Sequence, residues 1–402
     1  MIYDVGIIGA GVAGCFASLR LADKHPNVKT IVFDIGKGFQ KRRRQLEGAL
    51  GSFPASDGKL YTNDFDKITE LTDGRKTKPI KQWVEDHLNE AGSNKKLIKD
   101  SLPNVSVQKK LKEDNFKIIA NNYFQWKPES IHQLSKNMID ILEKNSNITF
   151  NFDTEVYSII KKKNIFEVST SLGDFSCKKI ILASGRSGWR WTTNLYKNLG
   201  LSFEDDCARF GVRVELSGQY MKDFNKSHCT LIKDDLEIGP LSWNGTVIPE
   251  DHADLVISAF RSNEDRWKSE KVSFSLIKTV HFKNEGVKQT DRLAKLAFLL
   301  FNDRVSKEKI KLLLKGDSQL NLLPEYNWLP KTLEELNKYI PNLLNRGYFH
   351  VPTIITVPSK INLNSSLESE LDGLFVVGEN AGEIGILFAA MSGAIAADSV
   401  CK

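Results

Sequence analysis

Three glycines near the start of the chain have the spacing of a phosphate-binding turn. Gly9, Gly11 and Gly14 form the pattern G-x-G-x-x-G, and Asp34 follows twenty residues after the last of them. In this pattern the first glycine permits a tight turn, the second lets backbone approach a pyrophosphate, and the third lets a helix pack on a strand. A carboxylate at this distance accepts hydrogen bonds from ribose hydroxyls and repels a 2′-phosphate. The pattern therefore favours FAD or NAD over NADP.

The segments around these glycines must place them between a strand and a helix. Residues 3–8 are an apolar, β-branched run typical of a buried parallel strand, and residues 13–21 repeat apolar side chains at helical spacing. A second strand is predicted over residues 30–33, directly before Asp34. This order predicts a Rossmann-like dinucleotide-binding fold. The alternative is a fold of this kind that has lost its ligand.

A second glycine-rich turn lies close to the other end of the chain. It runs from Gly378 to Gly385, between a predicted strand at 374–377 and a predicted apolar helix at 386–400, and its acid is Glu379. The acid could bind ribityl hydroxyls, and the helix N-terminus would face flavin or phosphate oxygens. A protein that binds only a nicotinamide dinucleotide needs no such second turn, so the pair of turns favours noncovalent FAD.

A third predicted element lies in the middle of the chain. Residues 180–183 form a buried strand that ends in Ala183-Ser184-Gly185, which suits a strand of the same sheet packed under a cofactor. The next residues include Arg186, Trp189 and Trp191, which are the candidate catalytic residues. Arg186 could hold an anionic substrate group or stabilise charge on reduced flavin, and the tryptophans could shield the flavin ring. The alternatives are an ion pair for Arg186 and ordinary core packing for the tryptophans.

The segment after Asp34 adds basic and polar groups to the predicted site. Residues 41–44 are all basic, and Arg43 is assigned to the pyrophosphate or ribityl chain; the alternative is a solvated charge run. Ser56 and Gly58 belong to a predicted turn with exposed backbone donors. No metal-binding cluster is expected. The predicted cofactor-binding residues are Gly9, Gly11, Ala13, Gly14, Asp34, Arg43, Ser56, Gly58, Val156, Ala183, Gly185, Gly378, Glu379, Gly382, Gly385 and Ile386.

Composition is that of an ordinary globular protein. The 402 residues are 41% hydrophobic and 26% charged, with a formal net charge of +6, which by itself does not indicate nucleic-acid binding. The five cysteines form no C-x-x-C pair, so scattered free thiols in a reducing cytoplasm are expected. No signal peptide is expected before the first strand. No apolar run reaches the length of a membrane span, and the apolar segment at residues 384–397 contains Ser392 and Gly393.

The order of the predicted elements divides the chain. We expect an α/β fold in which residues 1–200 and 351–402 form a Rossmann-like FAD-binding domain, with a parallel sheet and helices on its faces. Residues 201–350 are expected to form an inserted α+β substrate domain with a mainly antiparallel sheet. A small-molecule pocket between the two domains follows from this arrangement as a further expectation.

Taken together, the three motifs resemble those of the flavoproteins with two dinucleotide-binding domains. Within that superfamily the chain is most similar to a group of bacterial FAD-dependent dehydrogenases, whose S-D-G-K-L segment resembles residues 56–60 and whose G-V-R strand resembles residues 209–214. The resemblance implies an FAD-dependent oxidoreductase, a dehydrogenase or reductase acting on a small organic substrate.

Several functional alternatives remain open at this point. Within the same class they are a flavin monooxygenase and a double-bond reductase, and outside it a flavin-containing RNA-binding or RNA-modifying protein. Only one G-x-G-x-x-G occurs, so electrons must come from the substrate, from transiently bound NAD(P)H or from a redox partner protein. Substrate, electron partner and oligomeric state do not follow from the sequence.

Overall fold

Two units can be separated in the computed structural model, which describes residues 2–42, 44–72, 74–89, 96–252, 255–262, 264–302 and 304–402. Unit 1 comprises Met1–Lys96, Phe124–Asp205 and Val357–Lys402, and unit 2 comprises Leu97–Tyr123 and Asp206–Thr356. The sequence analysis assigned residues 97–123 to the first part of the FAD-binding domain. In the structure they group with unit 2, because β5 (Lys117–Ile119) pairs with β13 (Thr230–Lys233).

Unit 1 is built on a mixed sheet whose centre is parallel. The order of its parallel strands is β7-β2-β1-β10-β22. The first half of β10 also pairs with β9, which continues antiparallel into β8. The strands are β1 Ile2–Ile8, β2 Thr30–Phe33, β7 Ile148–Asn151, β8 Val156–Lys162, β9 Ile165–Thr170, β10 Gly173–Leu182 and β22 Leu374–Val376.

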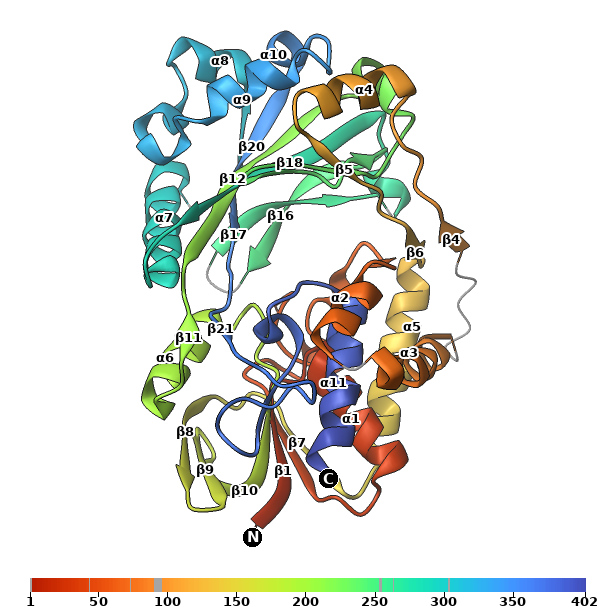
Figure 1. Ribbon diagram of the computed structural model, residues 1–402, viewed down its shortest axis with the longest axis vertical. Helices are drawn as coiled ribbons and strands as arrows, with labels where there is room; N and C mark the ends of the chain where they lie inside the picture. Colours follow the sequence, from red (N-terminus) through yellow and green to blue (C-terminus); the bar gives the residue numbers. More distant parts are fainter. Residues whose placement is uncertain are drawn as a thin grey trace. The chain divides into compact units, whose positions relative to one another are not determined.

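Both faces of this sheet are buried, as expected for parallel strands with continuous apolar sequences. Alternate residues contribute to separate cores: Ile7 packs in the core with the helices α1, α5 and α11, whereas Ile8 packs in the core with residues of α6. Figure 1 shows α1 and α11 side by side over the sheet. The helices of unit 1 are α1 Val12–Lys24, α2 Asp64–Leu71, α3 Gly74–Asn89, α5 Pro128–Glu143, α6 Trp189–Leu199 and α11 Ile386–Val400.

Unit 2 is built on an antiparallel sheet with the order β19-β20-β12-β18-β14-β13-β5, and β15 also pairs with β18. Along β12, Phe210, Val212 and Val214 enter the core and alternate with Arg209 and Arg213 on the other face. The strands are β12 Cys207–Ser217, β14 Leu236–Ile238, β15 Ser242–Trp243, β18 Lys271–His281, β19 Ser306–Lys309 and β20 Tyr348–Ile355, with a hairpin of β16 Thr246–His252 and β17 Leu255–Arg261. The helices are α4 Val105–Glu113, α7 Gly286–Phe301, α8 Ile310–Lys315, α9 Leu329–Leu336 and α10 Leu343–Arg346.

Five further short strands form two small sheets. They are β3 Lys59–Tyr61, β4 Lys96–Ile98 and β6 Tyr123–Gln125, in the order β3-β6-β4, and the pair β11 Phe203–Glu204 and β21 Lys360–Ile361. The division between the two units falls inside β4 and β6. A parallel α/β sheet in unit 1 and an antiparallel sheet with helices in unit 2 confirm the predicted fold class.

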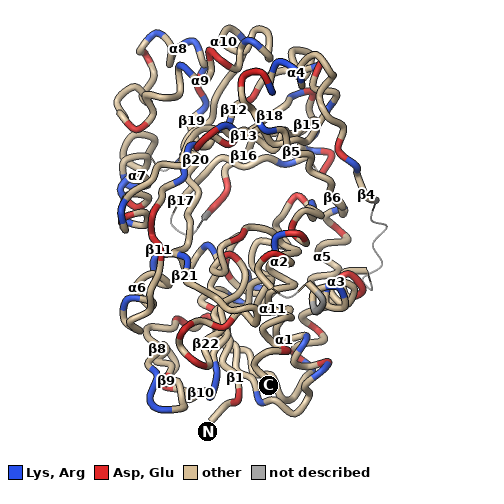
Figure 2. Tube along the Cα trace, in the orientation of Figure 1, with Lys and Arg blue, Asp and Glu red and all other residues tan. Residues whose placement is uncertain are grey.

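Helix apolarity and the distribution of charged residues can be described for the whole of the described structure. Among the residues that the structure describes, no helix has both the length and the apolarity needed to cross a bilayer. Short stretches of Lys and Arg and of Asp and Glu are interspersed along both units (Figure 2).

Candidate functional site

The three predicted motifs meet at one edge of the parallel sheet of unit 1. Because β1, β2, β10 and β22 are all parallel, their carboxyl ends lie at the same edge. Gly9, Asp34, Ala183 and Val377 come directly after these strands, and Gly378 follows. Ligands of open α/β sheets bind outside this edge, where neighbouring connections run in opposite directions. The edge is therefore the candidate cofactor site.

Glycine at the first turn is required by close backbone approaches. Gly9 has φ +106°, and an ideal Cβ on it would lie 2.3 Å from the carbonyl oxygen of Ala183. An ideal Cβ on Gly14 would lie 1.9 Å from the carbonyl oxygen of Gly9. Gly393, inside α11, is equally constrained, since its Cβ would lie 2.1 Å from the carbonyl oxygen of Ala13. The absence of side chains at these three glycines allows the turn, α1 and α11 to pack closely against one another.

Gly11 differs from these glycines, because an ideal Cβ on it meets nothing within 4 Å. Gly51 lies beside it, with its own ideal Cβ 3.3 Å from Cα of Gly11. Gly51 thus packs closely on the backbone of Gly11, while the side of Gly11 where a Cβ would point leaves a gap at the N-terminus of α1, whose first turn contains no acidic residue. A gap of this kind, next to the positive end of a helix dipole, fits the pyrophosphate of a dinucleotide.

The carboxylate of Asp34 is engaged with backbone in the structure. Its Oδ2 accepts from the N–H of Ala10 at 2.7 Å, and its Oδ1 accepts from the N–H groups of Gly36 and Gly48 at 2.7 and 2.8 Å. Burial raises the pKa of Asp34, and these three N–H groups act in the opposite direction. A carboxylate oxygen can accept two hydrogen bonds, so Oδ2 retains capacity for a ribose hydroxyl.

The basic segment after Asp34 contributes a structural arginine. The Arg42 guanidinium donates to the carbonyl oxygens of Ala49 and Gly51, and to that of Gln45 at 2.7 Å. It thereby holds the loop that brings Gly51 to Gly11. Arg43, the residue assigned to the cofactor from the sequence, lies outside the described residues.

An ion pair joins the second and third motifs. Nε and an Nη of Arg186 lie 3.0 and 2.9 Å from the two carboxylate oxygens of Glu379. Next to it, Oδ1 of the buried Asn380 accepts from the N–H of Gly185 at 2.7 Å. These contacts connect the loops that follow the neighbouring strands β10 and β22. Both partners of the ion pair belong to unit 1, so the acid that pairs with Arg186 does not come from another domain.

The two candidate tryptophans are packed inside unit 1. Trp189 is 1% exposed, and the Arg190 guanidinium lies 4.4 Å from the centroid of its ring system. Trp191 is partly buried against the core that contains Ile8. This burial among apolar side chains favours the core-packing alternative for Trp189.

The remaining predicted residues differ in how they relate to the edge. Ala13 touches it, since the ideal Cβ of Gly378 would lie 3.2 Å from the Cβ of Ala13. Ser56 accepts from the N–H of Gly58 at 3.2 Å, so this expected backbone donor already has a partner. Val156 is buried at the start of β8. Gly382, Gly385 and Ile386 lead into α11, and Ile386 is half-buried.

Three polar residues of the edge were missed in the sequence analysis. Asn380 directly follows Glu379 and could have been found from its place in the glycine-rich turn. Ser392 accepts from the N–H of Gly378 at 2.9 Å from within the predicted helix. Asp64 begins α2 and lies against Gly385, a contact for which no local sequence signal exists.

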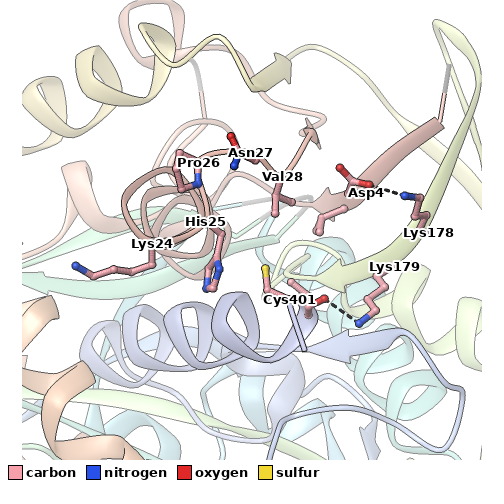
Figure 3. Close-up of a pocket in the computed structure, with 11 residues that line it drawn as sticks. Asp4, Lys24, His25, Pro26, Asn27, Val28, Lys178, Lys179 and Cys401 are labelled. Atoms are coloured by element: carbon pink, nitrogen blue, oxygen red, sulfur yellow. Dashed lines mark hydrogen bonds and ion pairs between the residues drawn. The ribbon is translucent and has the colours of Figure 1, made fainter.

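A cavity of about 470 Å³ lies at the opposite, amino end of the parallel strands (Figure 3). Lys178 of its wall lies 2.8 Å from Oδ1 of Asp4, and Lys179 donates to the carbonyl oxygen of Val400 at 2.8 Å. The ends of α1 and α11 also line it, and helix C-termini favour cations over anions. The cavity therefore does not belong to the candidate cofactor site. No metal-binding group of His, Cys, Asp and Glu occurs within the described ranges.

Comparison with known proteins gives distant structural similarities. No family model matches the chain, and no curated protein matches it. It is similar to glycine oxidase from Geobacillus kaustophilus, with 15% identity, 99% of this chain and 94% of that chain covered, and a TM-score of 0.45. It is also similar to dithionite-reduced L-alpha-glycerophosphate oxidase from Mycoplasma pneumoniae with FAD bound. The identity is 14%, 100% of this chain and 94% of that chain are covered, and the TM-score is 0.47. A third similar structure is a flavoprotein/dehydrogenase from Cytophaga hutchinsonii, with 14% identity, 100% of this chain and 78% of that chain covered, and a TM-score of 0.43. Similarities of this size carry no argument about function.

Proposed function

We propose that unit 1 binds FAD noncovalently and that the protein is an FAD-dependent oxidoreductase. The observation that supports this most directly is the open space at Gly11, where an ideal Cβ meets nothing within 4 Å, at a sheet edge where a second glycine-rich turn also precedes a helix. Gly9 to Gly14 would hold the pyrophosphate, and Asp34 the adenosine ribose. The turn from Gly378 to Gly385 would hold the flavin half. The flavin supplies hydride or electron transfer when bound.

The finer assignment is a dehydrogenase or reductase acting on a small organic substrate. This rests on the resemblance of residues 56–60 and 209–214 to the dehydrogenase group, and a flavin monooxygenase or double-bond reductase is the alternative. The free cysteines favour a cytoplasmic location. In this proposal the flavin exchanges electrons with the substrate and with a second partner, which is either NAD(P)H or a redox protein.

The proposed function is tested by the spectrum of the purified protein. We expect a yellow protein that releases FAD on heating or acidification and that is bleached by anaerobic photoreduction. A substrate screen under anaerobic conditions would then identify the compounds that reduce the flavin. A colourless protein that gains neither flavin absorbance nor thermal stability when FAD is added would contradict the proposal.

The role of Asp34 leads to a quantitative expectation. Asp34→Ala should weaken FAD binding by about 1–3 kcal/mol, because a charge-assisted hydrogen bond to the ribose is lost. It should also destabilise the apoprotein, since the N–H groups of Ala10, Gly36 and Gly48 lose their acceptor. FAD titration and urea unfolding measure the two effects separately. Unchanged FAD affinity would mean that Asp34 serves only the backbone.

The role of Arg186 is tested by Arg186→Met. If Arg186 acts on the substrate or on reduced flavin, the variant keeps FAD but changes the rate of flavin reduction or the flavin potential. Arg20→Met is a matched control, because Arg20 makes a similar two-point ion pair with Asp398 at 2.8 Å elsewhere in unit 1. If Arg186→Met, like the control, lowers only thermal stability, Arg186 is a structural partner of Glu379.

A further inference from the structure

The two helices that begin at the candidate site differ in charge at their N-termini. The first turn of α1 contains no acidic residue and faces the gap beside Gly11. At α11, by contrast, the side chain of Asp64 lies against Gly385, the residue before the helix. An ideal Cβ on Gly385 would lie 2.1 Å from Oδ2 of Asp64. The two N-termini are thus suited to different ligand groups.

Asp64 is buried and incompletely satisfied. Its side chain belongs to the first residue of α2 and the residue is 4% exposed. The N–H groups of Leu387 and Phe388, in the first turn of α11, face its carboxyl group. Its Oδ2 is buried and has no hydrogen-bond partner among the described residues. An unpartnered buried oxygen at a helix N-terminus indicates a missing hydrogen-bonding group.

The surroundings of Asp64 favour its protonated form. Burial raises its pKa to about 7, and nearby Glu383 acts in the same direction. Lys67 opposes both, as do the N–H groups of Leu387 and Phe388. The Lys67 ammonium is itself 3.2 Å from a carboxylate oxygen of Glu383, so its influence is shared between two acids. The balance of these influences favours the protonated form of Asp64 up to a higher pH than for an exposed aspartate.

We propose that Asp64, in its protonated form, is a cofactor-binding residue that donates a hydrogen bond to a neutral carbonyl oxygen of the flavin ring at the N-terminus of α11. The inference rests on the proposed FAD function and adds to it a residue and a proton. Ionisation of Asp64 removes the donor and places a negative charge beside an acceptor oxygen. FAD binding is then coupled to the uptake of one proton at pH values above the pKa of Asp64.

A phosphate is a poorer fit to this position than a ring oxygen. A pyrophosphate is negatively charged at all pH values near neutrality, and an acid as close as Asp64 would repel it whenever ionised. The first turn of α1 contains no acidic residue, and Asp34, the acid near its start, accepts from Ala10, Gly36 and Gly48. There is also room at Gly11. The pyrophosphate is therefore assigned to α1 and an uncharged flavin oxygen to α11.

The test is the pH dependence of FAD affinity, measured by titrating the full-length apoprotein and following flavin fluorescence. The dissociation constant of the wild type should begin to rise near the pKa of Asp64 at about 7, and above about pH 8 the rise should approach about tenfold per pH unit, as one linked proton requires. Asp64→Asn keeps a donor but cannot ionise, so its affinity should be independent of pH and close to that of the wild type at about pH 6. Asp66→Asn, an exposed acid in the same helix, is the matched control and should follow the wild type.

A second probe tests the adenosine and pyrophosphate half of the cofactor alone. ADP-ribose carries this half but no flavin, so the pH dependence of its affinity should be the same for the wild type and for Asp64→Asn. If ADP-ribose affinity depends on pH in the wild type but not in Asp64→Asn, a phosphate lies at α11 and the inference is overturned. Equal pH slopes for wild type and Asp64→Asn with FAD would also overturn it. If no variant binds FAD at any pH, the proposed function itself fails.

Discussion

Gly11→Val should abolish FAD binding without unfolding the protein. An ideal Cβ on Gly11 meets nothing within 4 Å, so the apoprotein can accommodate the side chain. The same side chain would occupy the gap at the N-terminus of α1 where the pyrophosphate is proposed to lie. We expect FAD affinity to fall at least about a hundredfold, which corresponds to about 2.8 kcal/mol. FAD titration by flavin fluorescence, together with urea unfolding of the apoprotein, measures both quantities.

Gly11→Ala provides the graded control for this prediction, because its single methyl group fills only part of the gap. It should retain the stability of the wild type and bind FAD with an intermediate affinity. If Gly11→Val binds FAD as tightly as the wild type, the pyrophosphate does not approach this turn. If the variant instead unfolds, the gap is not open in the way that the structure indicates.

Gly393→Ala should destabilise unit 1, although the substitution favours a helix. Within an exposed helix, Ala is about 1 kcal/mol more favourable than Gly. At Gly393 the added methyl group would lie 2.1 Å from the carbonyl oxygen of Ala13 and 3.1 Å from the backbone nitrogen of Ala17. Overpacking against backbone should therefore reverse the sign and destabilise by about 3 kcal/mol, the upper end of the usual range.

The measurement for Gly393→Ala is the urea midpoint of unfolding, compared with that of Gly11→Ala. Both variants add one methyl group to a glycine of unit 1, but only one of these methyl groups meets backbone. A shift to lower urea for Gly393→Ala alone is expected. A stabilised or unchanged Gly393→Ala would show that α1 and α11 separate at little energetic expense.

Local patterns in the sequence predicted much of unit 1. Strand β2 was predicted over residues 30–33 and helix α11 over 386–400, and both were confirmed with the same limits. Each is a short apolar block bounded by a glycine, a polar residue or a change of period. The alignment of motifs at one edge also followed, because parallel strands place their carboxyl ends together.

Other features depend on contacts that local patterns do not contain. A strand was predicted over residues 180–183, but β10 begins at Gly173 and continues through Lys178 and Lys179. Its first half pairs with β9 and its second half with β22. The position of Asp64 against Gly385 joins residues far apart in the chain, and no local periodicity reports it.

The interleaving of unit 1 along the chain has a consequence for how the protein is made. Ile8 pairs with Leu182, and α1 packs on α11. The first elements to be synthesised therefore cannot form their native contacts until the last element has been synthesised. At about 5–20 residues per second this wait lasts tens of seconds. Unit 2 completes its sheet at β20, before any part of α11 exists. We therefore expect unit 2 to fold first on the ribosome, while the apolar surface of α1 depends on chaperones until α11 emerges.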